Sequence, residues 1–338
     1  MPEERNLLES LRRLGLILPG DQPEITPLTG GVSSDIVKVS TGDRTFCVKR
    51  ALPKLKVKAD WHAPIERNHW EAQWMRTVAA MDRSAAPEVL GEDRELGMIA
   101  MAYLDEASHP LWKQQLAMGV IDSTFARQVG ESIARIHSAT ARRAQIRERF
   151  ATDHIFLPIR LEPYLLATAT AHPDCAPQLM ALAQATAHTK LALVHGDVSP
   201  KNILRGPQGP VFLDAECAWY GDPAFDLAFC LNHMMLKCLW QPQWTARYLE
   251  CFDALASAYL GGVDWEARES IETRTARLLP GLFLARVDGK SPVEYITQDW
   301  QRERVRAVAR TLLLEPVREL SSVRDRWGEA MRQGNSGA

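Results

Sequence analysis

The chain has 338 residues, enough for two lobes that each bury a core. Forty basic and 42 acidic residues leave a formal net charge of −2 without a basic stripe, so we expect no nucleic-acid partner. Charges interrupt the leucines near the N-terminus, and no long uncharged apolar run follows. We therefore expect neither a secretory signal nor a membrane-spanning helix. The six scattered cysteines contain no CxxC pair, which indicates reduced thiols in a cytoplasmic protein.

The first hundred residues alternate between β-branched runs and helical spacing. The pattern predicts, in chain order, a helix at 6–16, antiparallel strands at 25–28, 36–40 and 45–49, a helix at 64–81, and strands at 87–90 and 96–104. The turn between the last two strands is expected at Gly91–Asp93. A proline at the start of the second helix suits a first turn.

The second part of the chain is predicted to be mostly helical. Helical spacing covers 124–143 and recurs from residue 225, and short strands are expected at 191–194, 203–205 and 211–213. We therefore predict an α+β fold with two lobes. Residues 1–104 form a small antiparallel sheet with one helix, which binds nucleotide, and residues 105–338 form a larger, mainly helical lobe for catalysis and substrate binding.

The segment from residue 193 to residue 216 carries the main chemical signal. It places Asp197, Asn202 and Asp214 on two loops that flank a tight hairpin. Phosphoryl transfer from ATP requires neutralised charge and an aligned acceptor oxygen more than covalent help. Asn202 and Asp214 supply the hard oxygen ligands that Mg²⁺ prefers. Asp197 is the expected catalytic residue, placed to orient an acceptor hydroxyl and take its proton.

These residues also carry a resemblance. His195-Gly196-Asp197, followed by Asn202 and then Asp214, resembles the signature of the aminoglycoside phosphotransferase and choline kinase superfamily, the small-molecule branch of the protein-kinase-like fold. Protein kinases have an arginine where Gly196 stands and a phenylalanine and glycine after the magnesium aspartate. The chain lacks these features and the Ala-Pro-Glu end of an activation segment.

A second block supports the same resemblance. The run from Gly221 to Leu227 is similar to the next block of the family, at the start of a helix. The resemblance implies that Asp226, within this run, anchors the catalytic loop from beneath.

The N-terminal strands are expected to supply the ATP site. Gly30, Gly31, Ser33 and Ser34 lie between two strands and resemble the nucleotide loop of the family. Glycines let backbone amides approach phosphate oxygens, and serine hydroxyls add donors. An ordinary hairpin turn is the alternative interpretation.

Lys49 ends the third expected strand. The resemblance implies that it binds phosphate and that a glutamate on the following helix orients it. Glu71 is the preferred partner because Trp70 and Trp74 frame it on a helix expected to pack against the sheet. Glu66 is the alternative.

The strand at 96–104 resembles the last strand before the hinge between the lobes. The resemblance implies that Met101 lines the adenine pocket. It also implies that the carbonyl of Ala102 and the amide of Leu104 contact the adenine edge.

The acceptor pocket is expected from residues 145–190 and 240–300, the most variable region of the family. Candidate acids and tryptophan walls there are Asp153, Glu162, Asp264, Glu266, Asp288, Trp240, Trp244 and Trp265. Arginines interleave with the acids, so no pocket for a cationic acceptor stands out. The stretch 286–292 looks like a functional loop or a surface turn. Cys230, His233 and Cys238 suggest a metal site, but core packing is the favoured interpretation.

The sequence thus predicts a kinase that uses ATP and Mg²⁺ to phosphorylate a hydroxyl of a small molecule, either an aminoglycoside-like antibiotic or a hydroxylated metabolite. Two alternatives stay open: a protein-kinase-like enzyme, which the missing activation segment disfavours, and an inactive nucleotide-binding scaffold. The retained Lys49, Asp197, Asn202 and Asp214 favour an active enzyme. The sequence leaves open whether the chain forms a homodimer.

Overall fold

The computed structural model describes residues 2–28, 33–42, 44–56 and 61–333. Gly30 and Gly31, predicted in the nucleotide loop, lie outside the described residues. Within the described ranges, no helix combines the length and apolar character needed to cross a membrane.

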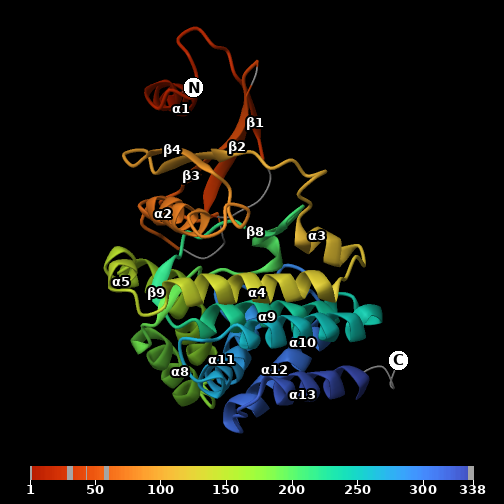
Figure 1. Cartoon of the computed structure of the whole chain (residues 1–338). Helices are drawn as coiled ribbons and strands as arrows, with labels where there is room; N and C mark the ends of the chain where they lie inside the picture. Colours follow the sequence, from red (N-terminus) through yellow and green to blue (C-terminus); the bar gives the residue numbers. More distant parts are fainter. Residues whose placement is uncertain (1, 29–32, 43, 57–60, 334–338) are drawn as a thin grey trace.

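The N-terminal part is a five-stranded antiparallel sheet with two helices (Figure 1). Its elements are α1 (Pro2–Arg13), β1 (Glu24–Pro27), β2 (Ser34–Ser40), β3 (Thr45–Ala51), α2 (Arg67–Ala79), β4 (Val89–Asp93) and β5 (Met98–Ala102). The strand order is β1-β2-β3-β5-β4. The expected strands are present, and α2 is shorter at both ends than the predicted helix.

Alternation along β3 assigns its side chains to two faces. Phe46 and Val48 are buried in a small cluster with Leu11 of α1. Lys49 points to the opposite face, where α2 packs and the cleft opens. The alternating pattern of the sequence therefore determines that Lys49 faces the cleft.

The turn predicted at Gly91–Asp93 is wrong, because these residues belong to β4. The register shifts between Val89 and Gly91, which marks a β-bulge. A Cβ at Gly91 would lie 3.1 Å from the side chain of Leu14, so the glycine permits a close approach after α1. The chain turns after Asp93, whose carboxylate accepts hydrogen bonds from the next backbone amides, and Gly97 adopts a left-handed φ of +56°.

The C-terminal part is a group of helices around two short sheets, below the large sheet in Figure 1. Its helices are α3 (Trp112–Ala117), α4 (Ser123–Thr140), α5 (Ala144–Arg149), α6 (Asp153–Phe156), η1 (Leu157–Leu166), α7 (Ala167–Ala171), α8 (Ala176–His188), η2 (Pro200–Asn202), α9 (Ala224–Trp240), η3 (Pro242–Trp244), α10 (Thr245–Gly261), α11 (Arg268–Asp288), α12 (Asp299–Leu314) and α13 (Leu320–Gln333). Its strands are β6 (Ala192–Val194), β7 (Ile203–Gly206), β8 (Gly209–Phe212) and β9 (Trp219–Gly221).

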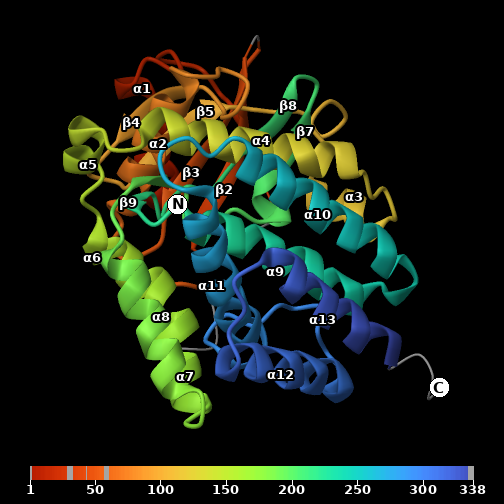
Figure 2. The same cartoon turned by 60° about the horizontal axis from the view of Figure 1, so that its bottom comes forward.

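Two helices define the centre of this part. The long α9 is buried from Ala224 to Leu239 and packs against both α10 and α11 (Figure 2). The helix η1 is a π-helix with Pro163 inside. A proline cannot donate the usual i→i−4 bond and clashes with the preceding turn, which is consistent with the wider winding.

The division of the chain at residue 104 stays a prediction.

Candidate active site

A cleft of about 440 Å³ lies between the large sheet and the β7–β8 hairpin. Nine of the predicted site residues line it: Ser33, Ser34, Lys49, Glu71, Met101, Ala102, Leu104, Asn202 and Asp214. They come from β2, β3, α2, β5, the segment after β5 and the two loops around the hairpin. The fold therefore brings together residues as far apart as positions 33 and 214.

Lys49 is at the centre of the charge network in this cleft. Its ammonium lies 2.6 Å from Oε2 of Glu71, so the predicted ion pair is present. It also donates to Oδ1 of Asp214 and lies 3.9 Å from Glu216. The alternative partner, Glu66, instead lies 2.7 Å from His154 at an exposed position.

The carboxylates decide the protonation of this network. Burial alone would lower the pKa of Lys49, but Asp214, Glu71 and Glu216 together raise it well above its ordinary range. Burial raises the pKa of Glu71 and opposes the pull of Lys49. Burial would raise the pKa of Asp214, but the nearby charge of Lys49 outweighs burial and lowers that pKa below its ordinary value. Because the lysine holds its proton so firmly, we describe the group as an ammonium among carboxylates.

Glu216 is a site residue that the sequence analysis missed. One carboxylate oxygen each from Glu216, Glu71 and Asp214 lie within 4.8 Å of one another. It accepts a 3.0 Å hydrogen bond from Nε of Arg67, which is fully buried on α2. Its position two residues after Asp214 could have indicated that it belongs to the site. Asp214 itself adopts a left-handed φ of +66°, an uncommon conformation that directs its side chain into the cleft.

Asp226 holds the loop that carries Asp197. Its carboxylate accepts from the backbone amides of His195 at 2.7 Å and Gly196 at 2.8 Å. His137 of α4 lies 3.2 Å from the same carboxylate through Nε2, and its other ring nitrogen lies 2.8 Å from the hydroxyl of Tyr259. These contacts give Asp226 the anchoring position that the resemblance implied.

The conformation of Gly196 explains why this loop has a glycine. Its φ is +81°, and a Cβ here would lie 2.9 Å from the backbone oxygen of Cys217. A side chain would therefore force the backbone apart. His195 precedes it: Nδ1 accepts from the amide of Asp197 and Nε2 donates to the carbonyl of Leu213, both at 3.1 Å. Burial lowers the pKa of His195, so the neutral ring links the two loops.

Asp197 is buried and faces two cations. Its Oδ2 lies 2.9 Å from Arg160 of η1 and 3.2 Å from Lys201 of the same loop. Arg160, which is 5% exposed, also donates to the carbonyl of Gly196. Oδ1 of Asp197 is buried and has no hydrogen-bond partner among the described residues. The sequence offered no signal for Arg160, since η1 has no regular helical pattern.

The oxygens near this point fit a divalent cation. The side-chain amide of Asn202 donates through Nδ2 to the backbone carbonyl of Asp197 at 3.1 Å. The side-chain oxygen of Asn202 therefore points away from Asp197. Asn202 and Asp214 both line the cleft and offer the hard oxygen ligands that a divalent cation prefers. The carboxylate oxygens of Glu71, Asp214 and Glu216 form a neighbouring group within 4.8 Å of one another.

The candidate acids of the acceptor region are engaged elsewhere. The ion pairs join Asp153 to Lys190, Glu162 to Lys290, Glu266 to Arg274 and Asp288 to Arg306. Asp264 accepts from Ser138 at 2.9 Å. Within the described ranges, no cluster of metal ligands includes Cys230, His233 or Cys238.

The candidate tryptophans do not form a common wall. Trp265 is buried beside His137, and Trp240 stacks on Tyr295 with their ring centroids 4.6 Å apart. Trp244 is partly buried against the core.

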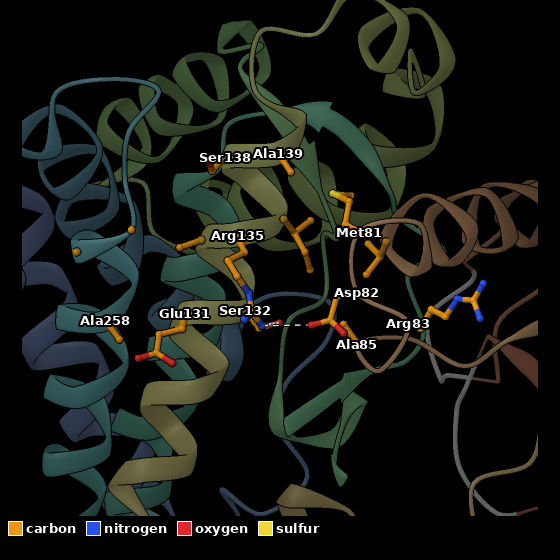
Figure 3. A pocket seen from close by; sticks show the side chains of 15 residues that line it. Met81, Asp82, Arg83, Ala85, Glu131, Ser132, Arg135, Ser138, Ala139 and Ala258 are labelled. Atoms are coloured by element: carbon orange, nitrogen blue, oxygen red, sulfur yellow. Dashed lines mark hydrogen bonds and ion pairs between the residues drawn. The ribbon is translucent and has the colours of Figure 1, made fainter. Parts of the chain in front are cut away.

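A larger cavity of about 1090 Å³ lies away from these residues (Figure 3). None of the predicted site residues lines it. Asp82, three residues after the end of α2, points across it toward Arg135 of α4, and their charged groups lie 3.3 Å apart. The paired charges leave this cavity without the chemistry that the smaller cleft contains.

Similar sequences include methylthioribose kinases. That of Yersinia pseudotuberculosis is 26% identical over 231 residues, which are 60% of this chain and 55% of that protein. That of Enterobacter sp. (strain 638) is 23% identical over 254 residues, 66% of this chain and 62% of that protein. The chain thus spans little more than half the length of the curated relatives it matches.

Similar solved structures show the same fold at low identity. A choline/ethanolamine kinase family protein from Mesorhizobium loti has a TM-score of 0.56 and 18% identity, and the match covers 96% of this chain and 98% of that one. An amicoumacin kinase has a TM-score of 0.54 and 12% identity, with 95% and 98% covered. These likenesses confirm the predicted two-lobed α+β fold. The profile of the phosphotransferase enzyme family matches residues 24–267, well over half of the sequence, and the chain belongs to that family.

Proposed function

We propose that the protein transfers the γ-phosphoryl group of ATP to a hydroxyl of a small molecule. The observation that carries this proposal is the convergence of Lys49, Asn202 and Asp214 on one cleft, with Asp197 held on the adjoining loop by Asp226. The amicoumacin kinase that shares this fold was solved with AMP-PNP and Ca²⁺, which supports a nucleotide and a divalent metal for this chain.

The nucleotide side of the cleft has a role for each residue. Lys49, oriented by Glu71, donates to phosphate oxygens, and the buried hydroxyl of Ser34, which has no partner among the described residues, adds a further donor. The amide of Ala102 already donates to the carbonyl of Glu88 at 2.9 Å. We therefore assign the carbonyl of Ala102 and the amide of Leu104 to the adenine edge, beside Met101.

The transfer side depends on Asp197. Its free Oδ1 accepts the proton of the acceptor hydroxyl, while Arg160 and Lys201 fix the other oxygen. Asn202 and Asp214 would hold Mg²⁺, which neutralises phosphate charge when bound. The hydroxyl oxygen forms the new bond to phosphorus, ADP leaves, and the product is a phosphate monoester.

The test is ADP formation by the purified protein with ATP, Mg²⁺ and a panel of hydroxylated metabolites and aminoglycosides. We expect acceptor-dependent ADP formation with at least one compound and its loss in Asp197→Asn. Tight ATP binding without turnover on any acceptor would instead support the inactive scaffold.

A further inference from the structure

A small recess of about 20 Å³ adjoins the nucleotide cleft on the side of the helical lobe. Lys113 and Lys201 line both spaces, so these two side chains lie at the boundary between them. The recess is otherwise lined by α9, α11 and the segment after α11, with His233, Lys237, Arg286 and Tyr295 facing it. Figure 2 shows α9 and α11 side by side. The volume of the recess is about that of one water molecule, so the recess admits an oxygen or two of a ligand's polar head rather than a whole molecule.

Lys237 and Arg286 in this recess form no ion pair, and the carboxylate of Glu294, which also lines the recess, is paired with Lys113. Lys237 is 1% exposed and Arg286 is 7% exposed. Among the residues that the structure describes, no carboxylate lies within 4.0 Å of either side chain's charged nitrogens. Lys237 Nζ instead lies over the rings of Trp240 at 4.7 Å and Tyr295 at 5.0 Å. Burying an unpaired charge is costly, so two such residues side by side call for an anion.

Three polar atoms at the same place also lack hydrogen-bond partners in the described part of the chain. They are Nε2 of His233, the hydroxyl of Tyr295 and Nε of Arg286, all buried. Buried polar groups are almost always hydrogen-bonded, and unsatisfied ones need an explanation. Their convergence on a recess lined by cations fits an oxyanion that accepts several hydrogen bonds.

The other two lysines of the recess are compensated. Lys113 forms an ion pair with Glu294, and Lys201 lies 3.2 Å from Asp197. Lys237 and Arg286 are therefore the cations of the recess without an ion pair, and neither lines the nucleotide cleft. Arg286 donates hydrogen bonds to the hydroxyl of Tyr164 and to Ser291, whereas its Nε has no partner among the described residues. Lys201 joins the recess to Asp197, so a group bound here belongs to the molecule that approaches the catalytic carboxylate.

We propose that the acceptor carries an anionic group, a carboxylate or a phosphate, and that Lys237 and Arg286 bind it while the acceptor hydroxyl faces Asp197. This substrate class rests on the proposed phosphotransferase function. It excludes a purely cationic acceptor, because an ammonium in this recess would meet two unpaired cations.

Binding of the anion is tested without turnover. Thermal unfolding of the full chain is measured with sodium acetate or sodium phosphate, against sodium chloride at equal ionic strength. The proposal predicts that at least one of the two anions raises the melting temperature of the wild type. Lys237→Met should abolish that rise, and Tyr295→Phe should reduce it. Lys290→Met, an exposed control whose partner is Glu162, should retain it. A rise with acetate indicates that the recess binds a carboxylate, and a rise with phosphate indicates that it binds a phosphate group.

Two outcomes of this experiment overturn the proposal. One is the absence of any anion-dependent rise in the wild type. The other is a rise that Lys237→Met and Lys290→Met retain equally. Because Tyr295→Phe removes only a hydroxyl, it keeps the test valid if Lys237→Met does not fold.

Turnover is tested with matched acceptors that differ in charge: glycerate against glycerol, gluconate against glucitol, ribose 5-phosphate against ribose, with choline as the cation. We expect the anionic members to be preferred. Lys237→Met should raise KM for them by about 10- to 100-fold, the loss expected for a charged hydrogen bond, and leave KM for ATP unchanged. Preference for neutral or cationic acceptors overturns this inference alone. ATP hydrolysis or transfer that no acceptor stimulates, together with intact anion binding, overturns the proposed function instead.

Discussion

Lys49 and Lys237 are equally hidden from solvent, at 2% and 1% exposure, and they differ in what surrounds their ammonium groups. Lys49 meets Glu71, Asp214 and Glu216, and these carboxylates overcome burial and raise its pKa. Lys237 meets two aromatic rings, and burial together with Lys113 lowers its pKa to about 7.

This difference separates two kinds of polar site. In the nucleotide cleft the protein itself supplies the carboxylates that neutralise Lys49, so this lysine is charged and oriented before any ligand binds. In the recess Lys237 forms no ion pair among the described residues, and the proposed ligand supplies the partner that it lacks. The first arrangement favours stability and the second sacrifices stability for binding, a common conflict at functional sites.

The largest effect is expected at Asp197, which adjoins both regions through Lys201. Asp197→Asn should lower kcat by about 10²- to 10⁴-fold, the usual contribution of a general base. ATP affinity should stay near that of the wild type, because Asn202 and Asp214 still face the cleft. Single-turnover kinetics and calorimetric titration with AMP-PNP measure the two quantities. Undiminished turnover would show that another group accepts the proton.

The compensated lysine should be needed for stability. Lys49→Met removes the cation shared by the buried Glu71 and Glu216 and the partly buried Asp214, and we expect a loss of about 3–5 kcal/mol in the free energy of unfolding. Urea unfolding monitored by circular dichroism measures it.

Glu71→Gln and the double variant complete a cycle with Lys49→Met. A coupling energy of about 0.5–3 kcal/mol is expected for residues in one network. Additive losses would show that Glu71 does not orient Lys49.

The uncompensated lysine should behave in the opposite way. Lys237→Met removes a buried unpaired charge and should raise the free energy of unfolding of the ligand-free protein, by about 1–4 kcal/mol. Lys290→Met, on an exposed side chain, should leave it nearly unchanged. A loss of stability in Lys237→Met would mean that its ammonium has a partner in the folded protein.

The stability gain of Lys237→Met over the wild type should depend on pH. The unfolded chain keeps the Lys237 proton up to about its ordinary pKa of 10.5, while the folded chain releases it near pH 7. Between these values the unfolded state binds more protons, so Lys237 makes wild-type stability rise with pH. The advantage of Lys237→Met should be greatest below pH 7 and shrink toward pH 10.

The groups that face Lys237 in the recess are Lys113, Lys201, His233, Arg286, Glu294 and Tyr295. They are the same in both proteins, so the difference between the two unfolding curves isolates Lys237. A gap that does not change with pH would contradict the lowered pKa.

A smaller effect is expected at Arg160, which lies outside both regions and holds Asp197 in place. Arg160→Met should lower kcat by about 10-fold through misplacement of the carboxylate and leave KM for ATP unchanged. Arg160→Lys keeps the charge and should recover part of the rate. A variant that loses rate and ATP affinity together would indicate a general structural role.

The nucleotide cleft could largely be predicted from sequence because local rules place its residues. Period-two alternation directs Lys49 away from the α1 face of the sheet, and Asp197, Asn202 and Asp214 lie within one short segment around a hairpin. Gly91 shows the limit of such rules, since a glycine that resembled a turn residue marks a bulge against Leu14.

The recess could not be predicted because it depends on packing between distant elements. Lys237 lies on α9, an almost wholly buried helix whose sequence indicated a core element. Arg286 lies on α11, nearly fifty positions further along the chain. Arg160 lies in a π-helix, for which hydrophobic spacing has no template. Only their three-dimensional arrangement shows which charges are paired and which are not.

The most direct test of the account is ³¹P NMR of ATP and Mg²⁺ incubated with the purified protein and the charge-matched acceptors. We predict a new phosphate monoester resonance with an anionic acceptor, present for the wild type, absent for Asp197→Asn and weakened for Lys237→Met. Inorganic phosphate as the only product, or an unchanged ATP spectrum with every acceptor, would contradict it.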